Sequence, residues 1–257
     1  MTAFETTFDD ATIDYDKSRP MYVKEIYKDI LCYQPIDSNS IVLEIGMGTG
    51  KATGPVLDTG CCLTGIEPGK QLADFARQRF VNYANFTLEN QTLQEFGGQE
   101  KSFDLIYAAT AFHWIPEEYG YKRVFQLLKP GGTFARFAYH AGADKGRAAM
   151  AEEIQGIYSK YFPHRQRPKE FSLDDAKKTA ALADKYGFYD IRYDIYSAQK
   201  DFTADEYMAL LRTYPDHMKL EVQTRKKLFD EIYSVIQNHG GSLTVYYTMD
   251  LELARRP

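Results

Sequence analysis

Short apolar runs alternate with amphipathic segments through the first half of the chain. Four segments are predicted to be strands, and in the first of them apolar residues follow one another and end at turn-forming residues. These predicted strands span residues 41–46, 62–67, 85–89 and 133–139. Apolar positions at helical spacing predict helices over residues 22–32, 71–80 and 118–128. Strands that alternate with helices in this way predict an α/β fold with a doubly wound parallel sheet.

The alternation changes after about residue 142. Further helices are predicted over residues 146–161, 173–186, 204–213 and 217–238, and further strands over residues 191–198 and 243–254. We expect the segments at about 143–185 and 203–240 to form a helical cap over the carboxyl edge of the sheet, where open α/β sheets bind ligands.

The whole chain, residues 1–257, is expected to be a single domain, since its length allows one large domain or a domain with a lid. Its N-terminal arm, residues 1–34, is the expected lid. The polar residues 1–20 are expected to be partly mobile until they fold over a ligand.

The first predicted strand runs directly into a glycine-rich turn. Gly46, Gly48 and Gly50 stand at alternate positions, and a backbone without side chains can approach a ligand closely. Glu67 ends the second predicted strand, where an acid can accept hydrogen bonds from the hydroxyls of a ribose. The two features together predict a pocket for an adenosine-containing cofactor.

Two phosphate-binding motifs fit this turn poorly. A dinucleotide fingerprint requires glycine where Lys51 stands, and a P-loop requires a hydroxyl where Ala52 follows Gly50-Lys51. An NAD(P)-dependent oxidoreductase on a similar sheet is nevertheless kept as an alternative. The absence of a Tyr-x-x-x-Lys or comparable hydride-site pattern argues against it.

The segment Glu44–Gly50 reads E-x-G-x-G-x-G and resembles motif I of the class I S-adenosylmethionine-dependent methyltransferases. Residues 103–114 resemble the fourth strand of that family with its exit loop, and Leu127–Phe134 resembles the turn into the fifth strand. The Y-x-x-x-R-P-x-Y segment Tyr15–Tyr22 is similar to a branch that includes trans-aconitate-methyltransferase-like proteins. The resemblance implies a Rossmann-like methyltransferase fold: a mostly parallel seven-stranded sheet with an antiparallel final strand and a helical cap.

The resemblance also implies S-adenosyl-L-methionine as the cofactor and a set of residues that bind it. The set consists of Tyr15, Arg19, Glu44, Gly46, Met47, Gly48, Gly50, Glu67, Pro68, Thr92, Leu93, Ala109 and Thr110. Thr92 departs from the acid that often contacts adenine in this family, and its hydroxyl accepts the adenine amino hydrogen less strongly. Structural alternatives are a buried Glu44 satisfied by loop amides, a Thr92 that caps a turn and a solvated arm around Arg19.

Residues at the ends of the later strands, together with Tyr214 in a Thr-Tyr-Pro turn of the predicted cap, are candidates for binding the methyl acceptor. His113 is predicted to be catalytic as a general base, or to orient the substrate, and its structural alternative is a histidine bonded to the backbone. His113, Trp114, Tyr139 and Tyr214 form the predicted substrate-binding set. Methyl transfer is an in-line displacement that depends on alignment and exclusion of water, and a carboxylate acceptor needs no base. The branch resemblance favours a carboxylic acid or a similar O- or N-acceptor.

Composition narrows the possible partners. The chain of 257 residues has a formal net charge of −5 and lacks a [DNS]-P-P-[YFW] motif, so a nucleic-acid substrate is not expected. No apolar run reaches the ~20 residues that span a bilayer, and three cysteines with five histidines show no metal-ligand spacing. The expectation is a cytoplasmic monomer or homodimer that methylates a small molecule without a metal. A non-catalytic module that only binds S-adenosylmethionine is a further alternative.

Overall fold

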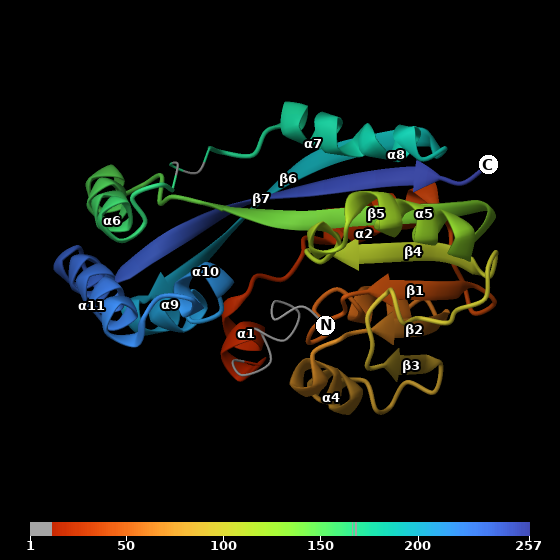
Figure 1. Ribbon diagram of the computed structural model, residues 1–257, viewed down its shortest axis with the longest axis horizontal. Coiled ribbons are helices and arrows are strands. Elements are labelled where there is room, and N and C mark those ends of the chain that lie inside the picture. Colours follow the sequence, from red (N-terminus) through yellow and green to blue (C-terminus); the bar gives the residue numbers. More distant parts are fainter. Residues whose placement is uncertain (1–11, 166, 168) are drawn as a thin grey trace.

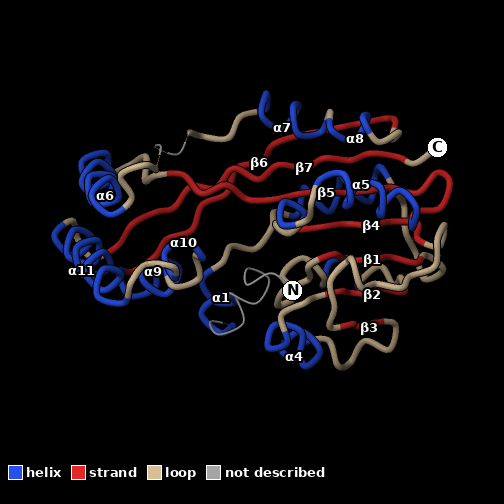
Figure 2. The backbone as a smooth tube through the Cα atoms, in the orientation of Figure 1, coloured by secondary structure: helices blue, strands red, loops and turns tan. Residues whose placement is uncertain are grey.

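The computed structural model describes residues 12–165, 167 and 169–257. In this part of the chain one sheet has the strand order β3–β2–β1–β4–β5–β7–β6 (Figures 1 and 2). The strands are β1 (Ile41–Ile45), β2 (Cys62–Ile66), β3 (Phe86–Glu89), β4 (Phe103–Ala109), β5 (Leu128–Gly142), β6 (Tyr189–Thr203) and β7 (Ser242–Arg255). Pairs among β1 to β5 are parallel, whereas β7 is antiparallel to both β5 and β6. The predicted doubly wound, mostly parallel seven-stranded sheet with an antiparallel final strand is confirmed.

Helices cover both faces of this sheet. They are α1 (Thr12–Ser18), α2 (Lys24–Tyr33), α3 (Gly54–Leu57), α4 (Lys70–Arg79), the 3₁₀ helix η2 (Phe112–Trp114), α5 (Glu117–Leu127), α6 (Ala148–Tyr161), α7 (Leu173–Ala180), α8 (Leu182–Lys185), α9 (Ala204–Leu211), α10 (Pro215–Met218) and α11 (Val222–Asn238). Side chains of β4 alternate between two apolar clusters: Tyr107 packs in the cluster that includes α2, and Ile106 in the cluster that includes α5. The alternation follows from the two-residue period of a strand, and it buries the central strands on both faces.

Three strands continue beyond the parallel part of the sheet. β4 pairs with β5 only as far as Ala109 and Phe137, but β5 goes on to pair with β7 up to Gly142. β6 and β7 stay paired from Tyr189 to Thr203. β6 is therefore much longer than the predicted 191–198, because it is stabilised by a cross-strand partner that a single sequence does not reveal. β7 differs from the predicted 243–254 by only one residue at each end.

The helices after β5 lie in two places (Figure 1). α6, α9, α10 and α11 gather at the far end of the long strands, where α6 packs on α11. In contrast, α7 packs against β6 and β7, and α8 packs against β6. The segment 143–185, expected to belong to the cap, thus divides between the far end of the sheet and its flank.

The start of the described chain is helical. Thr12–Ser18 forms α1, which contacts α9 and α4, whereas the sequence pattern predicts no helix within the polar residues 1–20. The Asp16 carboxylate receives hydrogen bonds of 2.9 and 2.8 Å from the Arg79 guanidinium of α4. Contacts of this kind depend on the tertiary fold, so the local pattern could not predict them. Residues 1–11 of the predicted lid lie outside the described residues.

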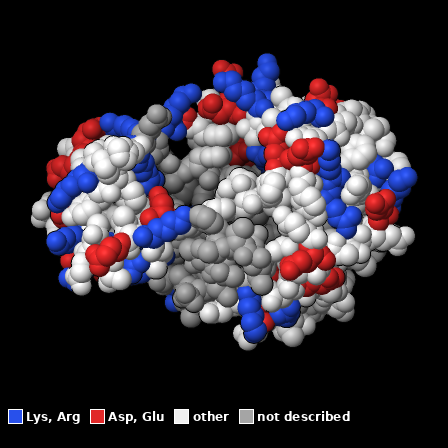
Figure 3. All heavy atoms as spheres, viewed as in Figure 1, with Lys and Arg blue, Asp and Glu red and all other residues white. Residues whose placement is uncertain are grey.

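Acidic and basic side chains are mixed on the face of the molecule that Figure 3 shows. No continuous region of one sign covers that face. Within the described ranges, no helix is both long and apolar enough to cross a bilayer. The same residues contain no group of three or more His, Cys, Asp or Glu side chains placed to hold a metal ion.

Candidate functional site

A cavity of about 270 Å³, here the first cavity, lies at the carboxyl edge of the parallel strands. It brings together most of the residues predicted to bind cofactor or substrate. These are Tyr15, Arg19, Gly46, Gly48, Glu67, Pro68, Thr92, Leu93, Thr110, His113, Trp114, Tyr139 and Tyr214. Three others, Glu44, Met47 and Ala109, line a small adjoining cavity of about 40 Å³. Gly50 lines neither cavity.

The glycine turn after β1 needs glycine for two different reasons. Gly46 and Gly48 have φ angles of +66° and +59°, in the left-handed region that other residues avoid. A Cβ atom on Gly46 would also lie 2.5 Å from the Cβ atom of Ala111. At Gly50 a Cβ atom would lie 2.3 Å from Cε2 of Phe80, so this glycine allows close packing instead of lining the cavity.

Glu67 is buried and connects the glycine turn to the loop after β2. Its Oε2 accepts a hydrogen bond from the Gly48 N–H at 2.8 Å, and its Oε1 accepts one from the Gly69 N–H at 2.8 Å. The Asn90 side chain donates to the backbone oxygens of Glu67 and Pro68 at 2.8 and 2.9 Å. A carboxylate can accept about four hydrogen bonds, and this one is held in a fixed position at the cavity wall.

Glu44 is buried beneath the turn. Its Oε2 accepts hydrogen bonds from the Thr53 hydroxyl at 2.6 Å and the Tyr107 hydroxyl at 2.7 Å. Hydroxyl groups thus satisfy this acid, rather than the loop amides of the structural alternative. Burial raises the pKa of Glu44 to about 7, although both hydroxyl bonds act in the opposite direction.

Thr92 both caps a turn and lines the first cavity. Its N–H and its hydroxyl each donate to Oε2 of Glu95 at 2.9 Å. The hydroxyl in turn accepts a hydrogen bond from the Glu95 N–H at 3.3 Å. The neighbouring Leu93 is almost fully buried and adds an apolar surface to the same wall. Thr92 therefore caps the turn, as its structural alternative predicts, and also lines the cavity.

Arg19 is a buried cation among tyrosines. Its guanidinium carbon lies 4.5 Å from the ring centroid of Tyr214, 5.2 Å from that of Tyr15 and 5.9 Å from that of Tyr139. Nη1 donates to the Tyr139 hydroxyl at 3.0 Å, and Nη2 donates to the backbone oxygen of Thr213 at 2.8 Å. Its Nε is buried and has no partner within the described part of the chain. An unsatisfied N–H of a buried cation indicates a missing acceptor.

Thr110 follows β4 in a strained conformation. Its φ angle is +53°, which is a genuine outlier for a β-branched residue. The Tyr22 and Thr110 hydroxyls form a hydrogen bond of 2.6 Å, and the Thr110 N–H donates to the Phe137 oxygen at 2.8 Å. Strain held by such contacts is concentrated at functional sites.

His113 and Trp114 lie at the rim of the first cavity. Both side chains are exposed, with Trp114 at 44% of its full accessibility. Their ring centroids are 5.1 Å apart. Surrounding protein atoms desolvate the His113 ring, and this effect, followed by the charge of Arg136, lowers its pKa. The neutral imidazole is therefore the form that faces the cavity near pH 7.

A second cavity of about 350 Å³ adjoins the first. The two share Arg19, Thr110, Ala111, His113, Tyr139 and Tyr214 in their walls. The second cavity extends over β5 and β7, where its polar residues are Arg136, His140 and Asp250. His140 Nε2 lies 2.8 Å from Oδ1 of Asp250, and the Arg136 Nε lies 3.1 Å from the Glu252 carboxylate.

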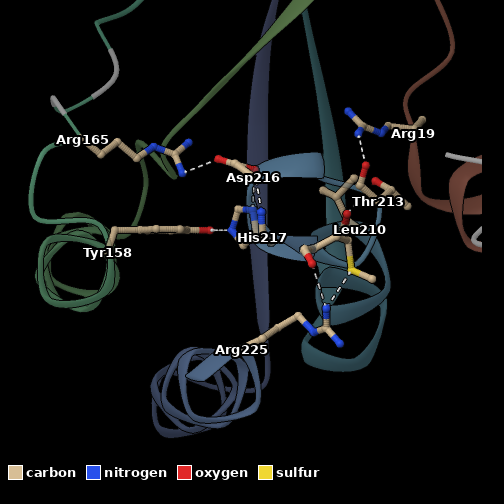
Figure 4. A network of polar contacts seen from close by, with 9 residues as sticks. Arg19, Tyr158, Arg165, Leu210, Thr213, Asp216, His217 and Arg225 are labelled. Carbon is tan, nitrogen blue, oxygen red and sulfur yellow. Dashed lines mark hydrogen bonds and ion pairs between the residues drawn. The ribbon is translucent and has the colours of Figure 1, made fainter. Parts of the chain in front are cut away.

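The cavity wall that carries Tyr214 is supported by a series of polar contacts (Figure 4). Arg165 donates to Asp216 at 3.0 Å, and His217 Nδ1 lies 2.8 Å from the same carboxylate. His217 Nε2 lies 3.0 Å from the Tyr158 hydroxyl of α6. Because a carboxylate only accepts, Nδ1 carries a hydrogen, and in the neutral ring Nε2 then accepts from the tyrosine. This connection fixes α10 to α6.

Several cavity residues were not predicted from the sequence. Ile45, Ile66, Leu72, Gln91, Gln94, Ala111, Ile115 and Pro215 also line the first cavity. Gln91 and Gln94 follow the third strand, so the rule that ligands bind at the carboxyl edge could have identified them. Tyr22 and the residues on β7 carry no such signal, because long-range packing of the loop before α2 and strand pairing bring them to the site.

Several known proteins to which this chain is similar are described as methyltransferases. Residues 42–132 match a family profile described as a methyltransferase domain. An uncharacterized methyltransferase-like protein of Schizosaccharomyces pombe is 25% identical over 258 residues, which cover 98% of this chain and 96% of that protein. A malonyl-[acyl-carrier protein] O-methyltransferase of Marinomonas is 27% identical over 128 residues, or 49% of this chain and 47% of that protein.

A solved structure shares the fold. Phosphoethanolamine N-methyltransferase 2 of Haemonchus contortus, in complex with phosphomonomethylethanolamine and S-adenosylhomocysteine, has a TM-score of 0.56 and 17% sequence identity. The match covers 97% of this chain and 57% of that structure, so this chain spans little more than half of its length.

Proposed function

This chain belongs to the class I S-adenosylmethionine-dependent methyltransferases, and we propose that it transfers the methyl group of S-adenosyl-L-methionine to the carboxylate of a small organic acid. The position of Arg19 carries this proposal. Its guanidinium lies in the wall common to both cavities, and its buried Nε lacks an acceptor within the described residues. A carboxylate that bridges the cavities would pair with this buried cation through a charge-assisted contact.

The first cavity has the features that the cofactor requires. The glycine turn keeps side chains out of the space above it, since the nearest atom to a Cβ on Gly48 would be a Tyr15 ring carbon at 3.9 Å. Glu67 offers fixed carboxylate oxygens for the ribose hydroxyls. Thr92 and Leu93 offer a hydroxyl and an apolar surface for the adenine.

We assign the remaining predicted cofactor residues by their place around this turn. The backbone from Gly46 to Gly48 would lie under the amino-acid part of the cofactor. Glu44, Met47 and Ala109 surround the small cavity beside the turn, where Glu44 would hold the turn and bind the cofactor's ammonium through water. Pro68 and Thr110 complete the wall of the first cavity. Gly50 has an indirect part, because it allows Phe80 to pack closely beneath the turn.

S-adenosylmethionine, when bound, supplies a methyl group that its positive sulfur already activates. The residues of this chain would then align the acceptor and exclude water. The rings of Tyr15, Tyr139 and Tyr214 surround Arg19 and limit the space in which the acid can move. A carboxylate acceptor carries no proton that must be removed.

His113 and Trp114 would form the acceptor side of the entrance. The lowered pKa of His113 leaves its imidazole neutral near pH 7, so it can orient an acceptor by a hydrogen bond or take a proton from one that carries it. Trp114 would provide the wall of the pocket.

Three observations support an acidic small molecule. The face of the molecule in Figure 3 carries no broad basic surface for nucleic acid, and the net charge of the chain is −5. The Marinomonas relative is named a malonyl-[acyl-carrier protein] O-methyltransferase, and a malonyl group carries a carboxylate. The Tyr15–Tyr22 segment resembles a branch of the family, and this resemblance favours a carboxylic acid or a similar O- or N-acceptor.

The oxidoreductase alternative is not favoured. The turn lacks the third glycine of the dinucleotide fingerprint at Lys51, and the matched relatives are methyltransferases.

The first test measures S-adenosylhomocysteine binding by calorimetry. Wild type is expected to bind and Gly48→Val to fail, because valine is strained at a φ of +59°. An absence of binding by the wild type would exclude the proposed function.

The second test incubates the enzyme with methyl-labelled S-adenosylmethionine and a panel of small carboxylic acids. Label in a product that base hydrolyses to methanol is expected, since methyl esters are base-labile. Label that survives base would exclude carboxylate methylation, and no label in any acid of the panel or in a metabolite extract incubated in the same way would favour a non-catalytic module.

Arg19→Lys should lower the labelling rate about tenfold or more, because an ammonium cannot make the same three directed contacts. Arg123→Lys is the matched control, since Arg123 donates to the oxygens of Phe96 and Gly98 and lines neither cavity. Equal rates for the two variants would contradict the role given to Arg19.

A further inference from the structure

His140 and Asp250 form a polar pair on the floor of the second cavity. They lie on the neighbouring strands β5 and β7, and neither lines the first cavity. Asp250 is almost fully buried, whereas about a third of the His140 side chain is exposed. The His140 ring stacks on Phe171 with centroids 3.7 Å apart and an interplanar angle of 5°. The imidazole is thus fixed in both position and orientation.

The contact with Asp250 determines which nitrogen of His140 carries the hydrogen. Nε2 lies 2.8 Å from Oδ1 of Asp250, and a carboxylate can only accept. Nε2 therefore donates, and in the neutral form of the ring Nδ1 carries a lone pair. In the described part of the chain Nδ1 has no hydrogen-bond partner. The pair thus presents a fixed hydrogen-bond acceptor at the second cavity.

This acceptor lies away from the place of methyl transfer. The transfer must occur where the two cavities meet, at the wall formed by Arg19, Thr110 and His113. Since His140 lines only the second cavity, it would contact a part of the substrate other than the reacting carboxylate. Phe112, Phe137 and Phe171 also line the second cavity and provide apolar surfaces for the body of the substrate.

We infer that His140, oriented by Asp250, is a specificity-determining residue that binds a hydroxyl or N–H group of the acceptor. The inference rests on the proposed function, because it places the reacting carboxylate at Arg19. The substrate is then an acid with a second, hydrogen-donating group on an apolar body. An acid without such a donor would leave Nδ1 desolvated and unpaired, which costs affinity.

The test compares small aromatic acids as probes, with S-adenosylhomocysteine saturating the first cavity. Calorimetry measures the affinity of 3- and 4-hydroxyphenylacetate, 4-aminophenylacetate and 4-methylphenylacetate. Wild type is expected to bind at least one probe with a donor about five- to tenfold more tightly than the methyl probe. His140→Phe keeps a flat ring against Phe171 and should abolish this preference, while the affinity for the methyl probe changes less than about twofold.

His239→Phe is the matched control. His239 also pairs with a carboxylate, since its Nε2 lies 2.9 Å from Oε1 of Glu153, but it lines neither cavity. This variant should keep the wild-type preference. A wild type that binds S-adenosylhomocysteine but does not prefer the donor probes would overturn this inference alone. A wild type that does not bind S-adenosylhomocysteine would overturn the proposed function.

A second measurement does not depend on the folding of a variant. Long-range proton–nitrogen NMR of the wild type should place the hydrogen of His140 on Nε2. The Nδ1 signal should shift with a preferred donor probe and stay in place with the methyl probe. A hydrogen on Nδ1, or equal shifts with both probes, would contradict the inference.

Discussion

The backbone N–H of Gly48 donates a hydrogen bond of 2.8 Å to the carboxylate of Glu67. This bond joins the turn after β1 to the end of β2, which are the two parts of the chain expected to hold opposite ends of the cofactor. The acid is therefore already oriented by the turn before any ligand enters. Preorganisation of this kind reduces the cost of ordering the site on binding.

Glu67→Gln should weaken S-adenosylhomocysteine binding by roughly 10- to 100-fold, the range for a hydrogen bond to a charged group. In the wild type, the N–H groups of Gly48 and Gly69 each donate to one oxygen of the Glu67 carboxylate. In Glu67→Gln the side-chain NH2 group replaces one of these oxygens, so it must face one of the two N–H donors. Calorimetry measures the change. Glu221→Gln is the control, since Glu221 caps α11 away from the cavities. Equal affinities for the two variants would exclude a role of Glu67 in binding.

Gly46→Ala should lower the affinity for the cofactor, in addition to the stability that it loses through backbone strain. Gly46 and Gly131 both have positive φ angles, but only a Cβ at Gly46 meets an atom within 4 Å, at 2.5 Å from Ala111. Alanine at either site costs about 1–2 kcal/mol of backbone strain. Urea unfolding should show that cost in both variants, and calorimetry should show a loss of S-adenosylhomocysteine affinity in Gly46→Ala only. A similar loss in Gly131→Ala would disprove the local effect.

Glu44 should make the stability of the protein depend on pH. Burial raises its pKa from 4.5 to about 7, so the folded state binds more protons than the unfolded state between these values. The free energy of unfolding therefore falls as pH rises through this window. Glu44→Gln should remove roughly 2–3 kcal/mol of this dependence.

Urea unfolding of wild type and Glu44→Gln from about pH 5 to 8 measures the difference. The raised pKa of Glu252, about 8, affects both proteins and cancels in that comparison. Parallel stability curves for the two proteins would show that Glu44 does not titrate in this window.

The ion pair between Asp16 and Arg79 should hold α1 against α4. Asp16→Asn weakens the two contacts of 2.9 and 2.8 Å, so α1 should open more often and trypsin should cleave after Lys17 several times faster. S-adenosylhomocysteine should slow this cleavage in the wild type. Mass spectrometry of the fragments measures both rates.

Asp74→Asn is the control for this experiment, because Asp74 pairs with Lys70 and Arg77 on the exposed side of α4. Cleavage that is insensitive to both Asp16→Asn and S-adenosylhomocysteine would show that α1 is not a lid.

The sequence predicted the features that depend on local chemistry. The apolar run before Gly46 and the acid at Glu67 are contiguous patterns, because a parallel strand and its turn are specified within a few residues. The parallel sheet followed from the repeated alternation of strands and helices.

Other features depend on contacts between distant parts of the chain. His140 meets Asp250 only because β5 and β7 pair with His140 opposite Thr248, and no single sequence reveals that register. The tyrosines around Arg19 come from α1, β5 and the loop before α10, so a local pattern could suggest Tyr15 and Tyr214 but not their common partner. α1 was missed because its seven residues are too few to form a stable helix without tertiary contacts.

Beyond Phe137, β5 is paired only with β7, and the helices at that end rest on an antiparallel ribbon. Mutations in this ribbon can alter the space for the acid while the nucleoside half of the enzyme stays intact. Substrate preference can thus change during evolution while the residues that bind the methyl donor stay the same.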